Sequence, residues 1–363
     1  MNYDFDNDLS LKLKLSLAND YTDNWDGRRF GNNSLTIRQQ LRSTVKNITQ
    51  RIGLRLSVRK ILTIHKKDIQ WLYERLADSE SRELLLSVMA YRILGHRKVK
   101  LPLNTSAYWN ELDELEISAD TNDCIELDFL EWKVCRNDLK DYGYPVQVYA
   151  RASGVMTQFL LQQYRCVTEG HTIEANDGDT VIDCGGCYGD TALYFACKAG
   201  QHGKVYSFEF MPNNLSVFNR NLTCNPAVGS RVEIIPHPVW ACSGETLYIE
   251  GHGPATNVTK TPKTIDINKV STLCIDNLVH QRLIKHINFI KMDIEGSELE
   301  ALRGAEQTIR RDKPKLAISV YHKLQDFWEI PQWIDTLNLG YRFYIRHFTI
   351  HSEETVLFAE VTE

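Results

Sequence analysis

Several features that define whole classes of proteins are absent from this sequence. Its 363 residues contain no uninterrupted apolar run long enough to cross a bilayer, so we expect no membrane-spanning helix. The first twenty residues carry early acidic residues, whereas a secretory signal begins with a positive segment followed by an apolar stretch. The chain shows no internal repeat and no low-complexity tract. We therefore expect a globular protein in the cytoplasm.

An excess of basic residues and a cysteine framework are absent as well. The 42 lysines and arginines stand against 47 acidic residues, and the net charge of −5 argues against a general nucleic-acid-binding protein. The nine cysteines are scattered from Cys124 to Cys274 without regular spacing. Because the sequence shows no export signal, we expect these cysteines to be reduced thiols.

The composition that is present, 43% hydrophobic and 25% charged residues, is typical of a soluble globular enzyme. The length favours two domains, and residues 1–150 are predicted to form a mainly helical region. Its first 35 residues are polar and expected to be loosely ordered, and apolar residues at helical spacing then predict helices between 41 and 94. Asp78 or Ser79 can begin one of these helices, and Gly95 can end it.

Residues 151–363 alternate strand-length apolar runs with amphipathic helical stretches. This alternation predicts a doubly wound α/β domain, with a mostly parallel sheet covered on both faces. Residues 243–286 break the rhythm and have the pattern of a hairpin-like insertion. The last segment, "YRFYIRHFTIHSEETVLFAEVTE", predicts two strands that pair antiparallel at the edge of the sheet.

The stretch "VIDCGGCYGDTALYFA" contains Cys184 and Cys187 in a Cys-x-x-Cys pair, a spacing found in redox dithiols and in metal sites. Both uses are disfavoured here. Asp183 and Asp190 would raise the pKa of the thiols, and no second pair of ligands is spaced for zinc. Two small residues packed in a tight turn explain the cysteines better.

The same stretch has the pattern of a cofactor-binding turn. Gly185, Gly186 and Gly189 follow a buried strand and open a helix, where the chain turns tightly and approaches a ligand closely. Glu209 ends the next strand, 24 residues after Gly185, at the spacing that places a carboxylate on ribose hydroxyls. Both NAD and S-adenosylmethionine carry such a ribose.

The acidic residues favour S-adenosylmethionine over NAD. Asp183 and Asp190 would repel the pyrophosphate of a dinucleotide, whereas they would attract a sulfonium and an ammonium group. Asp190 has a second explanation, because it can simply cap the helix that begins near Thr191.

Residues from about 176 to 360 resemble the FkbM-type methyltransferases, a family of S-adenosylmethionine-dependent O-methyltransferases. The matching segments are "DTVIDCGGCYGDTALYFA", "KVYSFEFMPNNLSVFNRNL", "VSTLCIDNL", "INFIKMDIEGSELEALRGA" and "LAISVYHKLQDFWEIPQWI". The resemblance implies a Rossmann-like class I methyltransferase domain over residues 151–363. It also implies that Asp183, Gly185 and Gly189 shape the methionine pocket and that Glu209 holds the ribose.

The resemblance further implies an acceptor, which is a hydroxyl of a sugar or of another polyhydroxylated metabolite in glycan or natural-product biosynthesis. The region 1–150 is similar to an accessory region of some family members, and we expect it to cover the site or recognise the acceptor. A homo-oligomer is the other partner that we consider.

The chemistry is expected beyond the carboxyl ends of the parallel strands, where ligands bind in open sheets of this kind. The segment "INFIKMDIEG" brings Asp293 and Glu295 to that edge, and "KLAISVYH" brings His322. His322 is the candidate general base because its ordinary pKa lies closest to working pH, and Asp293 is expected to orient it or the hydroxyl. His322 can instead cap the strand end. Asp293, Glu295 and His322 can also hold Mg²⁺ or Mn²⁺.

Several neighbouring residues have structural explanations. Ser297 and Glu300 fit a capping box, and Glu298 suits the first turn of the same helix. In "YIRHF", Arg346 and His347 either face the acceptor or belong to an ordinary edge strand.

Two other functions stay open at this point. A cofactor-binding interaction or regulatory protein would keep the pocket and lack the chemistry. An NAD-dependent oxidoreductase would bind NADH in the same turn.

Overall fold

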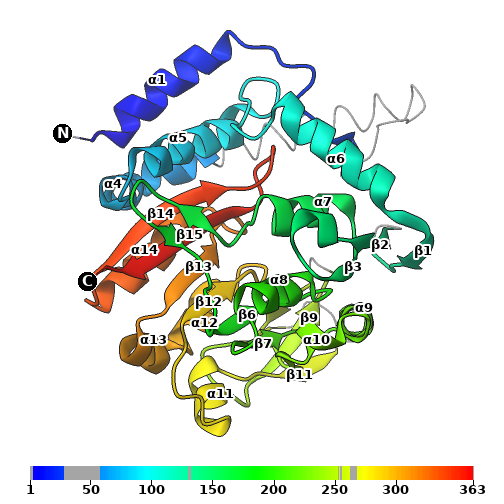
Figure 1. The fold of residues 1–363 in the computed structure, drawn as a ribbon. Coiled ribbons are helices and arrows are strands. Elements are labelled where there is room, and N and C mark those ends of the chain that lie inside the picture. The colour runs from blue at the N-terminus through cyan, green and yellow to red at the C-terminus, as the bar shows by residue number, and fades with distance from the viewer. Residues whose placement is uncertain are drawn as a thin grey trace.

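A seven-stranded sheet forms the centre of the molecule (Figure 1). The computed structural model describes residues 3–27, 58–129, 132–251, 253, 256–261 and 268–362. The strands lie in the order β14-β15-β13-β12-β6-β7-β8, so the two halves of the sheet meet between β12 and β6. These strands are β6 (Thr180–Cys184), β7 (Lys204–Phe208), β8 (Val232–Ile235), β12 (Phe289–Met292), β13 (Lys315–Ser319), β14 (Tyr341–His347) and β15 (Thr355–Val361).

Strand direction confirms the doubly wound fold. Strands β13, β12, β6, β7 and β8 pair in parallel, whereas β15 runs antiparallel to both β13 and β14. The last two strands thus form the antiparallel edge hairpin that the sequence predicts. An antiparallel strand between the parallel strands and the edge distinguishes this sheet from the all-parallel order of the dinucleotide-binding fold.

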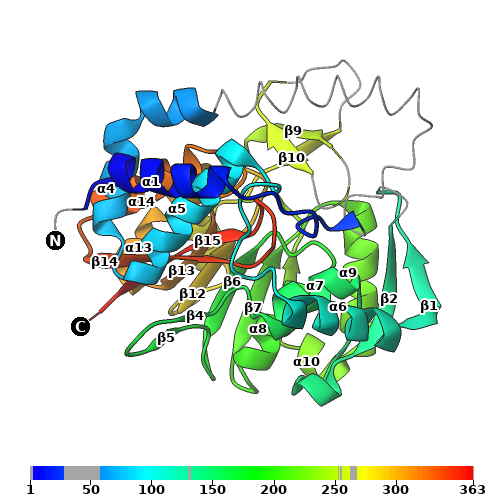
Figure 2. The same ribbon diagram turned by 90° about the horizontal axis from the view of Figure 1, so that it is seen from above.

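Helices cover both faces of the sheet (Figure 2), because successive strand residues point to opposite sides. Ile182 and Ile290 belong to one buried apolar cluster, while their neighbours Val181 and Phe289 belong to the other. The first cluster includes residues of α11 (Ile275–Gln281), α12 (Glu298–Arg303), α13 (Glu306–Asp312) and α14 (Asp326–Thr336). The second includes residues of α6 (Ser106–Ser118), α8 (Asp190–Lys198), α9 (Pro212–Cys224) and α10 (Pro226–Gly229).

The N-terminal region begins with a helix, contrary to the expectation of loose order over the first 35 residues. Asp4 caps α1 (Phe5–Leu17) by accepting a hydrogen bond from the backbone of Asn7, and Phe5 and Leu9 bury their side chains in the first cluster. Packing on α5 (Ser79–Leu94) orders this polar segment, as Figure 1 shows. The part of the predicted helical region at 41–57 lies outside the described residues.

The described helices of this region, α4 (Lys66–Arg75) and α5, confirm the helical prediction. Asp78 caps α5 through the backbone N–H of Ser81, and Gly95 ends it at a φ of +81°. The start of α5 lies against the edge strand β14, where Ala77 N donates to Phe343 O at 2.8 Å. The helical region therefore shares its core with the sheet, and a boundary near residue 150 stays a prediction.

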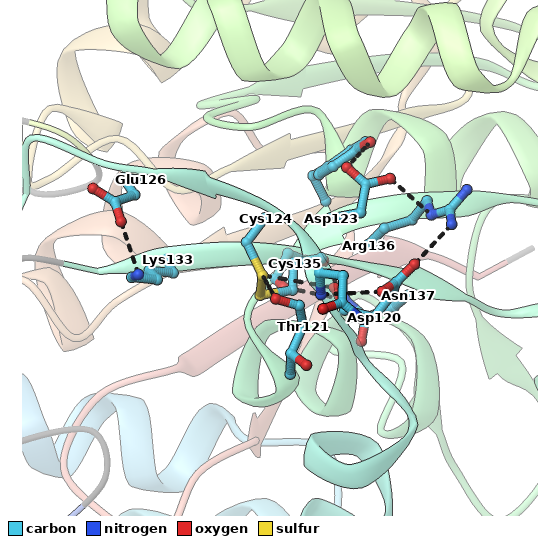
Figure 3. Close-up of a disulfide and its surroundings, with 12 residues drawn as sticks. Asp120, Thr121, Asp123, Cys124, Glu126, Lys133, Cys135, Arg136 and Asn137 are labelled. Atoms are coloured by element: carbon cyan, nitrogen blue, oxygen red, sulfur yellow. Dashed lines mark hydrogen bonds and ion pairs between the residues drawn. A yellow bond between two sulfur atoms is a disulfide. The ribbon is translucent and has the colours of Figure 1, made fainter.

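The expectation of reduced cysteines is wrong for one pair. Cys124 and Cys135 form a disulfide across β1 (Asp120–Glu126) and β2 (Lys133–Asp138), as Figure 3 shows. The two residues are partners in the antiparallel register of this hairpin, which continues into β3 (Gln147–Ala150). A register pairs these residues only once the strands have formed, so the spacing along the chain did not reveal it. The other seven cysteines are free.

The insertion at 243–286 is antiparallel, as predicted, but larger than a hairpin. It forms a sheet in the order β10-β9-β11, followed by α11. Its strands are β9 (Thr246–Glu250), β10 (Asn257–Thr259) and β11 (Lys269–Ser271). Within the described ranges, no helix combines the length and the apolarity that crossing a bilayer requires.

We predict that Cys135→Ser destabilises the oxidised protein, because the disulfide closes a short loop in the unfolded chain. A loop of this size is worth about 2–3 kcal/mol. The thermal denaturation midpoint should fall by a few degrees relative to wild type, and a reductant should lower the midpoint of wild type but not of the variant. Cys242→Ser, at an exposed free cysteine, is the control and should leave the midpoint unchanged. Alkylation of Cys124 in the unreduced protein would contradict the disulfide.

Candidate functional site

Glycines shape the turn between β6 and α8. Gly185 has a φ of +88°, and a Cβ there would lie 2.0 Å from the backbone oxygen of Asp293 on the neighbouring strand. At Gly189, where φ is +83°, a Cβ would lie 2.2 Å from the ring of Phe218. Only glycine meets both the conformation and the close packing. The turn therefore sits tightly at the carboxyl ends of β6 and β12, where the halves of the sheet meet.

The amides of this turn are already in use. The N–H groups of Gly185 and Gly186 both donate to the carbonyl of Phe208, at 3.1 and 2.9 Å. A dinucleotide site requires free N–H groups that face the pyrophosphate. These occupied N–H groups argue against NAD as the cofactor. The sequence alone did not show that they are occupied.

A buried ion pair lies beneath the turn. Lys291 Nζ is 3.0 Å from Asp183 Oδ1, and the exposed fractions of the two side chains are 1% and 0%. The ammonium also donates to the carbonyls of Cys184 and Gly185. Burial alone would lower the pKa of Lys291, but Asp183 and then Asp293 outweigh it and raise that pKa. The raised pKa favours the charged ammonium of Lys291.

The partners of Asp183 change the interpretation of this residue. Its Oδ2 accepts hydrogen bonds from Ser207 Oγ at 2.7 Å and from Thr191 Oγ1 at 3.0 Å. Lys291 pairs with the other oxygen and compensates the charge of the carboxylate. Asp183 does not line the pocket described below. The argument that Asp183 repels a pyrophosphate therefore loses its basis, and Asp183 supports the turn from beneath.

Asp190 and the two cysteines lie in the same turn. Asp190 is the first residue of α8, and burial raises its pKa although the backbone N–H of Thr191 favours the charged form. Burial also raises the pKa values of Cys184 and Cys187, and both cysteines are free. Protonated thiols do not act as redox nucleophiles, so a redox role for this pair is not favoured.

A pocket with about 580 Å³ of empty space opens above the turn. At one end lie Glu209 and Asn214. Glu209 Oε1 accepts hydrogen bonds from the backbone N–H groups of Phe210 and Met211, and Oε2 accepts one from Asn214 Nδ2 at 3.1 Å. Burial raises the pKa of Glu209, although these hydrogen bonds favour the charged carboxylate and lower the pKa. Asn214 Oδ1 is buried and has no hydrogen-bond partner, so it is a free acceptor beside the predicted ribose carboxylate.

The other end of the pocket is acidic, with Asp293 and Glu295 in its wall. The carboxylate of Asp293 accepts hydrogen bonds from Tyr164 Oη at 3.2 Å and Tyr321 Oη at 3.0 Å. Each tyrosine holds a different carboxylate oxygen, which fixes the orientation of Asp293. Tyr164 and Asn214 were not predicted from the sequence, because neither is a charged residue or a glycine.

Of the predicted site residues, four line this pocket: Gly185, Glu209, Asp293 and Glu295. The other five are not among the residues that line it: Asp183, Gly186, Gly189, Asp190 and His322. Gly186 is needed for packing, since a Cβ there would lie 2.2 Å from Ser207 Oγ.

His322 lies behind the acidic wall, among three carboxylates. Its Nδ1 is 3.0 Å from Glu298 Oε1, and its Nε2 is 3.4 Å from Asp293 Oδ1 and 3.6 Å from Glu295 Oε1. Burial would lower the pKa of His322, but Glu298 and the other two carboxylates outweigh it and raise this pKa to about 11. A protonated imidazole cannot accept a proton, so the raised pKa does not favour His322 as the general base.

The predicted capping box is absent. Ser297 stands at the start of α12 without a side-chain hydrogen bond, and Glu300 pairs with Arg303. Glu298 instead turns back, and its Oε1 accepts a hydrogen bond from Ile294 N at 2.9 Å. Glu298 thereby shapes the loop after β12, a role that its place in the first helical turn did not indicate.

Arg346 and His347 do not reach the pocket. Arg346 Nη2 pairs with Asp78 Oδ2 at 2.8 Å, and this ion pair joins β14 to the start of α5. His347 Nδ1 lies 2.9 Å from Thr355 Oγ1, and burial lowers the pKa of His347 to about 4. The edge-strand interpretation is therefore correct for both.

Comparison with known families gives a match over the same elements. Residues 183–343 match the model of the methyltransferase FkbM domain, which confirms the resemblance seen in the sequence. The match runs from Asp183 on β6 into β14 and so includes the turn, Glu209, Asp293 and His322. No protein of curated function matches the sequence significantly.

Solved structures share the fold. The structure of methyltransferase FkbM from Methylobacillus flagellatus KT aligns with a TM-score of 0.51 and 21% identity, over 83% of this chain and 60% of that chain. This chain thus spans less than two thirds of that protein. Aeropyrum pernix fibrillarin, with natively bound S-adenosyl-L-methionine, aligns over 66% of this chain and 93% of its own, at 13% identity and a TM-score of 0.36. The O-methyltransferase from Bacillus cereus in complex with SAH aligns over 70% and 91%, at 12% identity and a TM-score of 0.35.

We predict that Lys291→Met strongly destabilises the protein, because it leaves the buried carboxylate of Asp183 without a counter-charge. Breaking a buried pair in this way costs about 3–5 kcal/mol. Asp183→Asn combined with Lys291→Met should recover part of the loss, since both groups are then neutral. Lys204→Met, which removes a half-exposed partner 3.9 Å from Glu233, is the control and should cost about 1 kcal/mol or less. Denaturant unfolding of the four proteins measures these differences, and equal losses for Lys291→Met and Lys204→Met would contradict the assignment.

We also predict that Gly185→Ala is more harmful than Gly178→Ala. Both glycines have positive φ, of +88° and +83°, so both substitutions carry the strain of a left-handed alanine, about 1–2 kcal/mol. Nothing lies within 4 Å of a Cβ at Gly178, whereas the one at Gly185 meets Asp293 O. The difference between the two thermal midpoints measures the cost of the close contact at Gly185. Identical midpoints would contradict that contact.

Proposed function

Residues 183–343 form a methyltransferase FkbM domain, and from this we propose that the protein transfers a methyl group from S-adenosylmethionine to a hydroxyl oxygen of a sugar or another polyhydroxylated metabolite. One observation carries the proposal: a single pocket joins Glu209 and Asn214 at one end to Asp293 and Glu295 at the other. The first end suits a nucleoside, and the second suits an acceptor that offers hydroxyl groups.

The residues of the pocket fit this cofactor. The carboxylate of Glu209 and the unpartnered Oδ1 of Asn214 can both accept hydrogen bonds from ribose hydroxyls. Asp293 and Glu295 add negative charge where the cofactor carries its cationic sulfonium and ammonium groups. The same charges disfavour a pyrophosphate, which agrees with the occupied amides of Gly185 and Gly186.

Asp293 is the group that we assign to the acceptor hydroxyl. When bound, S-adenosylmethionine supplies an electrophilic methyl group, and the oxygen that takes it loses a proton. Asp293 lines the pocket and is held in place by Tyr164 and Tyr321, so its carboxylate can orient the hydroxyl and receive that proton. His322 does not line the pocket, so we do not assign it to the hydroxyl.

The contacts of the N-terminal region support a role in covering the pocket. Phe129, near the tip of the β1–β2 hairpin, packs so closely on Gly253 that a Cβ there would lie 2.8 Å away. Asp128 accepts a hydrogen bond from Asn213 Nδ2 at 2.9 Å. Gly253 lines the pocket and Asn213 adjoins Asn214, so the hairpin reaches the rim of the pocket.

We predict that the purified protein binds S-adenosylmethionine and S-adenosylhomocysteine with micromolar affinity in a calorimetric titration, and that it does not bind NADH. Glu209→Gln and Asn214→Ala should each weaken binding at least tenfold, because each removes a ribose contact. Asn213→Ala is the matched control: it changes the neighbouring asparagine, which bonds to Asp128 outside the pocket, and should bind normally. Binding of NADH alone would favour the oxidoreductase.

The chemistry needs its own measurement, since binding alone also fits a regulatory protein. Release of S-adenosylhomocysteine should be detected when sugars, sugar nucleotides and glycosides are offered as acceptors. Asp293→Asn should still bind the cofactor, more weakly because one negative charge of the pocket is lost, and should lose this turnover. Binding without turnover on any polyhydroxylated acceptor would support the non-catalytic alternative.

A further inference from the structure

Four ionisable side chains meet behind the acidic end of the pocket. The imidazole of His322 lies between Glu298 on its Nδ1 side and Asp293 and Glu295 on its Nε2 side, at distances of 3.0 to 3.6 Å. Asp293, Glu298 and His322 each place one oxygen or nitrogen atom within 4.8 Å of those of the other two. Oxygen and imidazole atoms at such separations can converge on one metal ion with only small side-chain movements.

The hydrogen bonding of this cluster is incomplete. Glu298 is fully buried, and its Oε2 has no hydrogen-bond partner. The side chain of His322 is 7% exposed, and neither of its ring nitrogens makes a hydrogen bond of good geometry, although carboxylates lie close to both. Buried polar atoms are rarely left without partners, and each such case needs an explanation. These unpartnered atoms belong to side chains that come within 3.0 Å of one another, and a bound ligand would account for them.

The charges of the cluster identify the kind of ligand. Three carboxylates lie around one imidazole, and the exposed fractions of Glu298, Asp293 and Glu295 are 0%, 19% and 34%. Buried charges are costly unless they are paired or coordinate a metal. A divalent cation compensates these carboxylates better than the single proton of an imidazole does. The mixture of carboxylate oxygens and an imidazole nitrogen suits Mn²⁺ better than Ca²⁺, which prefers oxygen alone.

We propose that Asp293, Glu298 and His322 bind a divalent cation such as Mn²⁺, with Glu295 at the open side of the site. The ligands come from the loop after β12, the first turn of α12 and the loop after β13, so the fold alone assembles them. Asp293 and Glu295 also line the pocket, and the cation therefore lies where two oxygens of a diol acceptor can reach it. The cation's part in the reaction rests on the proposed methyl transfer, but its binding does not.

The test is a titration of the chelator-treated full-length protein with MnCl₂, followed by calorimetry and by electron paramagnetic resonance of bound Mn²⁺. We expect one ion per chain. Glu298→Gln should weaken binding at least tenfold, since it removes a charge but keeps the oxygen that accepts from Ile294 N. His322→Ala should have a similar effect. Glu300→Gln, two residues along the same helix and paired outward with Arg303, is the matched control and should bind as wild type does.

A titration with S-adenosylmethionine on the same samples separates this proposal from the proposed function and reports whether each variant is folded. Cofactor binding without Mn²⁺ binding in wild type would overturn the cation site and leave the methyltransferase proposal standing. Equal Mn²⁺ affinities for wild type and a folded Glu298→Gln protein would overturn it too. Mn²⁺ binding that depends on Glu298 and His322, in a protein that does not bind the cofactor, would support the cation site and count against the methyl transfer.

Discussion

The buried ion pair of Lys291 and Asp183 is the constraint on which the rest of the site depends. The two residues are partners on adjacent parallel strands, so the pair joins the two halves of the sheet at the point where they meet. The ammonium also holds the carbonyls of Cys184 and Gly185, and the carboxylate holds Thr191 of α8 and Ser207 of β7. One pair of charges thus fixes four elements around the turn.

This arrangement divides the acidic residues of the site into two groups. Asp183 is neutralised beneath the turn, while Glu209, Asp293 and Glu295 stay in the wall of the pocket. In our proposal, the preference for a cationic cofactor comes from residues that follow β7 and β12 rather than from those that flank the glycines. The sequence already favoured S-adenosylmethionine over NAD, but the residues that account for this preference are different ones.

Behind the pocket, Glu298 links the loop after β12 to His322. Its Oε1 accepts from Ile294 N and lies 3.0 Å from the imidazole, so a residue that seems to serve only the helix also sets the charge of its neighbour. The raised pKa of His322 follows from this contact and from Asp293 and Glu295. The ordinary pKa of a histidine predicted a general base, whereas the raised pKa of His322 does not favour that role. The surroundings of a side chain, and not only its type, set its pKa.

How much the sequence revealed depended on whether the pattern was local. Strand and helix alternation predicted the sheet, and the cap at Asp78 and the end at Gly95 predicted α5, because these preferences act within a few residues. The helix at Phe5–Leu17 was missed, since its order comes from packing on α5 rather than from its own polar sequence. The disulfide was missed because it depends on the register that places Cys124 opposite Cys135.

The sequence by itself determined the class of the fold, the turn at Gly185 and the carboxylate of Glu209, because glycine conformation and strand spacing are properties of short segments. Only the tertiary structure decided which charges meet. Lys291 pairs with Asp183 across 108 positions of the chain, and His322 meets Glu298 across 24. Such pairs exist only where strands lie side by side, and burial there sets both the charge of each group and the role that it can take.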